Sequence, residues 1–193
     1  MEPITKFTTR TIVLPYKDID TDQIIPAEYM KGIDKEGLGQ HLFQRWRYDA
    51  KGKPIPAFPL NKPEAKGAQA LVTGDNFGVG SSREHAVWAM VSYGLKAVIS
   101  TSFADIFYNN ALNNALLPIK VPGELHKRIM EKSGQQVTID LEATTLQLAD
   151  GTTTQFPITT FKRKLLLAGQ TELDYLLGHM DAIIAYEQRR FQK

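Results

Sequence analysis

Two hydroxyl groups and a guanidinium that are suited to binding an anion lie close together in one short segment of this chain. The segment runs from Gly78 to Ala86 with the sequence GVGSSREHA, so that Ser81, Ser82 and Arg83 directly follow a glycine turn. An apolar pattern of helical spacing begins at Ala86 and places the serines near a helix N-terminus. The first N–H groups of a helix lack intrahelical partners and the macrodipole is positive there. The segment therefore predicts a site for a carboxylate or a phosphate.

A structural interpretation of the same serines is also open. Serine is a common N-cap residue, and Glu84 would supply negative charge to the first helical turn. Two other glycine-rich motifs do not fit. A P-loop needs a lysine directly after its second glycine, whereas the first lysine after Gly74 is Lys96. The dinucleotide-binding motif needs a third glycine where Arg83 stands, and an arginine would fill the space which that glycine leaves for helix packing.

The residues around the glycine turn alternate between strand and helix patterns. A strand at 71–72 precedes the turn, and the helix that follows it ends at Gly94. A β-branched run at 97–100, a helical face at 103–112 and an apolar run at 116–119 come next. This βαβα order predicts parallel strands covered by helices. It places the serine turn at the carboxyl end of a strand, where open α/β sheets bind their ligands.

The N-terminal part predicts one strand and an acidic loop. Apolar residues at 11–14 indicate the strand, and Asp18, Asp20 and Asp22 follow it closely. Such a segment is a solvent-facing loop or a calcium loop, although it lacks the central glycine and the closing glutamate of an EF-hand. The prolines within residues 51–63 predict an extended connection.

The last third of the chain changes its pattern after a short helix predicted at 124–132. Apolar residues alternate with polar ones at 137–148 and a turn follows at Asp150, which predicts a β hairpin or meander. The chain ends on an amphipathic pattern that predicts one C-terminal helix packed on the core. The apolar residues of this pattern are Leu173, Leu176, Leu177, Met180, Ile183 and Ile184. The expected fold class is α/β, with a mostly parallel sheet flanked by helices, a β hairpin and a C-terminal helix.

Length and composition indicate an ordinary globular chain. With 193 residues, of which 42% are hydrophobic and 23% charged, one domain spanning 1–193 is expected. The net charge of +2 and the lack of a dense basic stripe argue against nucleic-acid binding. No apolar segment has the pattern of a signal peptide or reaches the ~20 residues of a membrane helix, so we expect no membrane contact and a cytoplasmic location.

The chain contains no cysteine. This excludes disulfides, a thiolate nucleophile and thiolate-bound zinc or iron–sulfur clusters within the chain. The histidines are far apart and none forms a helical pair; they are His41, His85, His126 and His179. We therefore expect no metal site in this chain, and any cluster must come from a partner.

The motifs, taken in order, resemble the swivel domain of the aconitase superfamily. The resemblance rests on residues 76–86, on SFADIF at 102–107, on LLPI at 116–119, on DTDQIIP at 20–26 and on residues 38–48. It covers essentially the whole chain. Within the superfamily it points to the small-subunit family of bacterial 3-isopropylmalate dehydratase, and it implies a swivelling β/β/α domain.

This resemblance implies one subunit of a heteromeric hydro-lyase. Such an enzyme isomerises 2-isopropylmalate, a small dicarboxylate, to 3-isopropylmalate by dehydration and rehydration in leucine biosynthesis. The resemblance places a [4Fe–4S] cluster with one open iron on the large subunit, where it acts as a Lewis acid on the leaving hydroxyl. It implies no cofactor in this chain, which closes over the cluster, supplies a base and is active only with the large subunit.

The resemblance also implies roles for single residues. Ser81 would be an alkoxide base that removes the proton next to a carboxylate, stabilised by N–H donors of the glycine turn and the helix start. Arg83 would bind a substrate carboxylate through two hydrogen bonds, and Ser82 would donate to the same group. Asp22 matches an acidic active-site position, while a carboxylate that caps the loop is the alternative.

The loop from Ile24 to Asp34 bears on the choice of substrate. In aconitase this loop supplies a further arginine for the extra carboxylate of citrate, whereas this chain has none there. Tyr29, Met30 and Ile33 suit an isopropyl group instead. Lys31 could replace the arginine as a point charge, and we expect Tyr29 and Lys31 to be substrate-binding residues. A homoaconitase, a citraconate or dimethylmalate hydratase, and a noncatalytic anion-binding module are the alternatives.

Overall fold

The computed structural model describes residues 1–30, 35 and 37–191 and contains a central sheet. The seven described strands lie in the order β4-β3-β2-β1-β5-β6-β7. In chain order they are β1 (Lys6–Leu14), β2 (Ala70–Thr73), β3 (Ala97–Ser100), β4 (Leu117–Lys120), β5 (Gln136–Asp140), β6 (Thr145–Leu148) and β7 (Thr153–Gln155).

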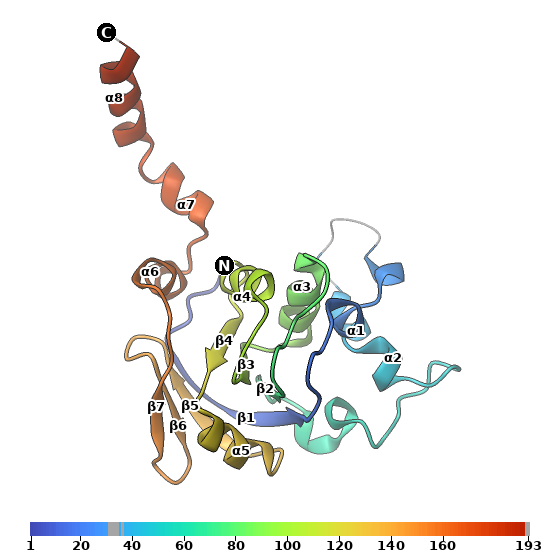
Figure 1. Cartoon of the computed structure of the whole chain (residues 1–193). Helices are drawn as coiled ribbons and strands as arrows, with labels where there is room; N and C mark the ends of the chain where they lie inside the picture. The colour runs from blue at the N-terminus through green and yellow to red at the C-terminus, as the bar shows by residue number, and fades with distance from the viewer. Residues whose placement is uncertain (31–34, 36, 192–193) are drawn as a thin grey trace.

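The α-helices of the described residues either lie on one of the two faces of this sheet or project away from it. They are α1 (Thr21–Ile24), α2 (Gln44–Arg47), α3 (Glu84–Tyr93), α4 (Asp105–Asn113), α5 (Gly123–Met130), α6 (Thr160–Ala168), α7 (Glu172–Leu177) and α8 (Met180–Phe191). Short 3-10 helices lie at Ala27–Tyr29, Leu38–His41, Pro59–Asn61 and Pro63–Ala65. Figure 1 shows α3 and α4 on one side of the sheet and α5 on the other. Of the described helices, none has both the length and the apolar character needed to cross a membrane.

The sheet changes from parallel to antiparallel at β1. Strands β1 to β4 pair in parallel, whereas β1, β5, β6 and β7 pair antiparallel. Every residue of β2 and β3 is buried, because parallel strands covered by helices are shielded on both faces. In β5 only Val137 and Ile139 are buried, as its alternating pattern predicts. The predicted α/β class, the βαβα order and the meander are thus confirmed.

The two edges of the sheet are short and irregular. One edge is β4, which contains Pro118 and so lacks one backbone N–H. The other edge is β7, a strand of three residues whose side chains are partly or fully exposed. The edge strand β4 still contributes Leu117 and Ile119 to the core, whereas β7 has no buried residue.

Two apolar cores lie on opposite faces of the sheet. Successive residues of a strand point to opposite faces, so Leu71 belongs to the core with Val87 of α3, whereas Val72 belongs to the core with Ile129 of α5. The core under α3 is the one that supports the serine turn. Most of the described apolar residues of the parallel strands belong to one of these two cores. The turns after β1 and β2 therefore follow strands that are packed on both faces.

An aromatic cluster lies directly beneath the glycine turn. The rings of Phe77 and Phe107 meet edge to face with their centroids 4.9 Å apart, and Phe103 packs against both. Gly78 lies against this cluster with a φ of +82°, and a Cβ atom there would come within 2.3 Å of Phe107 Cγ. The first glycine of the turn is therefore required both by its backbone angle and by the ring beside it.

The C-terminal part differs from the prediction. The single packed helix expected there is divided into α7 and α8, and Figure 1 shows both projecting away from the sheet. Leu173 and Leu177, which belong to the apolar pattern, have exposed fractions of 63% and 57%. The prediction that this stripe packs on the core of the chain is wrong. Amphipathic spacing identifies an apolar face but does not show which surface covers it.

Replacing Gly78 by alanine is expected to destabilise the chain by roughly 2–4 kcal/mol, because a left-handed alanine is strained and the new Cβ overlaps Phe107. Gly94 is the matched control, since it has a φ of +103° but no atom within 4 Å of an added Cβ. Gly94→Ala should therefore cost about 1 kcal/mol, the backbone strain alone. Urea unfolding of both variants measures the difference. Equal losses would show that Phe107 does not restrict this position.

Candidate active site

Two turns lie side by side at the carboxyl ends of β1 and β2 and form the candidate active site. The first turn leads from β1 into α1, and the second leads from β2 into α3. The Thr21 N–H donates to the Val79 oxygen at 2.9 Å, and the Gly78 N–H donates to the Ile19 oxygen at 2.8 Å. The Thr21 hydroxyl adds a hydrogen bond to the Ser81 carbonyl at 3.1 Å. Two distant parts of the sequence are thereby held together by their backbones.

Gly80 allows the close approach of these turns. Its φ is +92°, and a Cβ atom at this position would lie 2.1 Å from Asp20 Oδ2. The Asp20 carboxylate occupies this place because it caps α1, accepting from the Asp22 N–H at 2.6 Å. The Asp20 N–H in turn donates to the Gln23 side-chain oxygen at 2.8 Å, which completes a capping box. Asp20 therefore has a structural role, and any side chain at position 80 would displace it.

The structure does not support the interpretation of Ser81 and Ser82 as N-cap residues of α3. Arg83 is the N-cap residue, and no side chain in the described part of the chain caps this helix. Ser81 and Ser82 precede the cap and are exposed. Glu84 lies in the first turn, as predicted. The serines thus lie beside the positive end of a ten-residue helix, where an anionic group of a ligand is stabilised.

Arg83 and Asp22 form an ion pair between the two turns. A guanidinium N–H of Arg83 donates to Asp22 Oδ1, and the exposed fractions of the two side chains are 25% and 44%. Asp22 is not the cap of α1, since Asp20 has that role. The pair holds the guanidinium beside the serine turn. An arginine has five N–H donors, so further donors are available to the carboxylate of a ligand.

The loop after α1 is described only up to Met30 and again at Lys35. Tyr29 stacks on His41, with the ring centroids 4.0 Å apart. The preceding residue, Glu28, forms an ion pair with Arg45 at 3.1 Å. A hydrogen bond from its own backbone and the nearby guanidinium lower the pKa of the Glu28 carboxyl. Lys31, like Gly32 and Ile33 beside it, lies outside the described residues.

The structure brings four of the predicted site residues together. Asp22, Ser81, Ser82 and Arg83 lie where the two turns meet. The Tyr29 ring stacks on His41. The assembled group contains a hydroxyl suited to proton transfer, a second hydroxyl donor and a cation, which together fit a carboxylate-bearing ligand. The catalytic and binding roles of these residues stay predictions.

Two residues with positive φ values form a further contact between the two turns. Asp18 and Asn76 adopt positive φ values of 51° and 58°, and the Asn76 amide donates to Asp18 Oδ1 at 2.7 Å. The three acids of the first turn thus bind different protein groups: Asn76 for Asp18, the α1 backbone for Asp20 and Arg83 for Asp22. Among the described residues no group of three His, Asp or Glu could hold a metal ion. The structure does not support the calcium-loop hypothesis.

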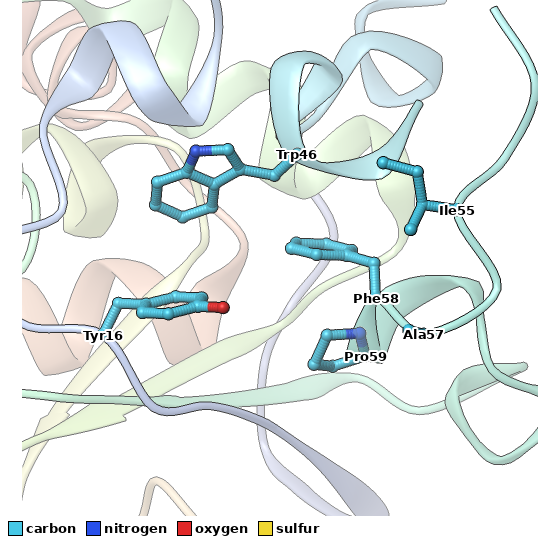
Figure 2. A pocket seen from close by; sticks show the side chains of 6 residues that line it. All are labelled: Tyr16, Trp46, Ile55, Ala57, Phe58 and Pro59. Atoms are coloured by element: carbon cyan, nitrogen blue, oxygen red, sulfur yellow. The ribbon is translucent and has the colours of Figure 1, made fainter. Parts of the chain in front are cut away.

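An aromatic pocket adjoins the first turn. Figure 2 shows the rings of Tyr16, Trp46 and Phe58 around it, and the first two have centroids 5.2 Å apart. The pocket has a volume of about 470 Å³, and its lining is completed by Ile55, Ala57 and Pro59. The Gly74 N–H donates to the Tyr16 oxygen at 3.0 Å, which connects the pocket to the glycine turn. Sequence patterns did not reveal this pocket because its lining comes from three separate segments.

Comparisons with known proteins agree with this geometry. The family model of the aconitase C-terminal domain matches residues 1–124. The chain is 52% identical over 190 residues to the 3-isopropylmalate dehydratase small subunit of Anaeromyxobacter dehalogenans (strain 2CP-1), which covers 98% of this chain and 100% of that protein. The small subunit from Roseiflexus sp. (strain RS-1) is 53% identical over 194 residues, with 98% and 95% covered. A crystal structure of 3-isopropylmalate dehydratase from Methanocaldococcus jannaschii matches with a TM-score of 0.67 and 31% identity, covering 95% of this chain and 99% of that one. With its two paired turns, its parallel half-sheet and relatives matched over nearly their whole length, the chain belongs to the 3-isopropylmalate dehydratase small-subunit family, within the family of the aconitase C-terminal domain.

Proposed function

We propose that this chain is the small subunit of an enzyme that isomerises 2-isopropylmalate to 3-isopropylmalate by dehydration and rehydration in leucine biosynthesis. The observation that carries the proposal is the position of Ser81, Ser82 and Arg83 at the start of α3, a helix that no described side chain caps. Full-length relatives named as small subunits of this dehydratase support it. A guanidinium beside two exposed hydroxyls suits one carboxylate of a small dicarboxylate.

Arg83 and Ser82 bind a carboxylate of the substrate in this proposal. In the free chain, the Arg83 guanidinium is paired with Asp22, and the Arg83 side chain is three-quarters buried. A substrate carboxylate takes the remaining N–H donors of the guanidinium, with the Ser82 hydroxyl as a further donor. The positive end of α3 adds to the attraction, so the negative charge of the substrate carboxylate is stabilised both by the Arg83 guanidinium and by the helix N-terminus.

Ser81 acts as the base that removes the proton from the carbon next to this carboxylate. A serine hydroxyl is ordinarily far too weakly acidic for such a role, so the alkoxide needs nearby positive charge. Arg83 and the start of α3 provide it. The Ser81 carbonyl accepts from the Thr21 hydroxyl at 3.1 Å and from the Arg83 N–H at 2.8 Å, which fixes the backbone that presents the hydroxyl.

The remaining part of the site belongs to the large subunit in this proposal. The chain has no cysteine, and its described residues include no set of three His, Asp or Glu for a metal ion, so they do not fit a [4Fe–4S] cluster. We place the cluster on the large subunit, where it would supply Lewis acidity toward the leaving hydroxyl. The exposed apolar residues of α7 and α8 are in keeping with a chain that has a partner. Residues 1–193 would act as one domain in the cytoplasm.

Ser81→Ala is expected to lower kcat of the enzyme reconstituted with the large subunit by about 100-fold to 10,000-fold, because it removes the base. Association of the subunits should be unchanged, since Ser81 is held through its backbone. The absorbance of the unsaturated intermediate measures turnover, and analytical ultracentrifugation measures association. A rate near that of the unchanged enzyme would remove Ser81 from the role of base.

Arg83→Lys is expected to raise KM by about 10-fold to 100-fold, because a lysine keeps the charge but loses a charged hydrogen bond worth about 1.5–3 kcal/mol. Arg45→Lys is the matched control, since Arg45 forms an exposed ion pair with Glu28 and not with Asp22. Steady-state kinetics with 2-isopropylmalate compare the two variants. Equal KM values for both would mean that Arg83 does not bind the substrate.

The loop without arginine predicts a preference for an apolar substituent on the substrate. The kcat/KM for 2-isopropylmalate should exceed that for homocitrate by at least about 10-fold, because Tyr29 and Met30 offer apolar contacts and no guanidinium for a third carboxylate. Parallel assays of 2-isopropylmalate, homocitrate and citraconate with the same reconstituted enzyme measure this preference. Faster turnover of homocitrate would favour the homoaconitase alternative.

A further inference from the structure

Asn114, the residue at the end of α4, connects three parts of the chain through its side chain. Its amide nitrogen donates to Glu84 Oε1 at 2.5 Å and to the Asn110 oxygen at 2.9 Å. Its amide oxygen accepts from Trp88 Nε1 at 3.0 Å and from Lys35 Nζ at 3.3 Å. The contacts join the first two turns of α3, the end of α4 and the segment that follows the substrate loop.

These contacts use the whole hydrogen-bonding capacity of a carboxamide. An asparagine side chain offers two N–H donors and two acceptor positions, and all four are engaged here. The Lys35 ammonium also lies 4.5 Å from the centre of the Trp88 ring. The two residues that donate to the Asn114 amide oxygen are therefore joined to each other by a cation–π contact. An aspartate of the same shape would keep the two acceptor contacts and lose both donor contacts.

Capping of α4 explains only part of what this side chain does. The Asn114 backbone N–H donates to the Ala111 oxygen at 3.1 Å, and the side chain adds one contact to the Asn110 oxygen of the same helix. Its contacts with Glu84 and Trp88 reach α3. Glu84, its partner there, directly follows Arg83, and α3 has no side-chain cap from the described residues. The contact between Asn114 and Glu84 is therefore the side-chain hydrogen bond that restrains the first residue of this helix.

We propose that Asn114 is a positioning residue for the carboxylate-binding arginine. By holding Glu84 it fixes the first turn of α3, and with it the backbone from which the Arg83 side chain extends. Asn114 does not touch the substrate in this proposal, which rests on the function proposed above. Because Arg83 binds the same carboxylate throughout the reaction, displacement of Arg83 raises KM more than it lowers kcat.

Asn114→Asp in the enzyme reconstituted with the large subunit tests this directly. The variant removes the donors and places a carboxylate beside Glu84, so KM for 2-isopropylmalate should rise on the order of 10-fold to 100-fold with a smaller change in kcat. Glu84→Gln combined with Asn114→Asp restores a donor and an acceptor with reversed polarity, and this double variant should recover most of the lost affinity. A KM unchanged in Asn114→Asp, or no recovery in the double variant, would overturn the proposal.

Asn113→Asp is the matched control, because it makes the same chemical change one residue earlier. Asn113 Oδ1 accepts from Lys162 of α6 rather than contacting Glu84, so the KM of the Asn113→Asp variant should equal that of the unchanged enzyme. An equal rise in KM for this control would show that charge alone, and not the contact with Glu84, causes the effect.

Amide hydrogen exchange of the isolated full chain separates this proposal from the proposed function. Asn114→Asp should speed exchange in the first turn of α3 more than in the second half of that helix, and the double variant should reverse the change. Uniform exchange across α3 in Asn114→Asp would overturn the positioning role whatever the turnover. An unchanged enzyme that does not convert 2-isopropylmalate would instead contradict the proposed function, and the exchange pattern would still decide the role of Asn114.

Discussion

The backbone contact between the turn after β1 and the glycine turn after β2 is the interaction on which the candidate site depends. Gly80 leaves the space that the Asp20 carboxylate fills, and the Thr21 hydroxyl reaches the Ser81 carbonyl across the same contact. Parallel pairing of β1 with β2 brings both turns to one edge of the sheet. A side chain larger than hydrogen at position 80 would separate the turns, and Arg83 would then lose its place beside the first turn.

Opposite charges meet in this site before any ligand is present. Asp22 neutralises Arg83, and the first turn of α3 carries Glu84, which Asn114 engages. Each cation or carboxylate is thus held by a protein group, so a ligand meets side chains that are already oriented. Binding then costs less conformational entropy than it would if a free arginine had to be ordered. The same arrangement makes the position of the guanidinium sensitive to groups that never touch the ligand.

The elements with local causes could be predicted from the sequence, and those decided by distant contacts could not. The β-branched run at 97–100 and Gly94 at the end of α3 depend on neighbouring residues, and the structure confirms both. The sequence offered Asp22 as a carboxylate that could cap the loop, whereas Asp20 caps α1 and Asp22 pairs with Arg83 of the opposite turn. Leu173 marks an apolar face without showing what covers it. Asn114 went unnoticed because its partners come from separate segments.

The antiparallel half of the sheet converts β1 from an edge strand into an interior one. Long, flat edges are templates for strand addition and aggregation. The edges that are left are poor templates, because Pro118 cannot donate within β4 and the three residues of β7 offer few hydrogen bonds. The sheet is thus a poor site for strand addition, and helices and turns are left as the surfaces through which another chain can associate.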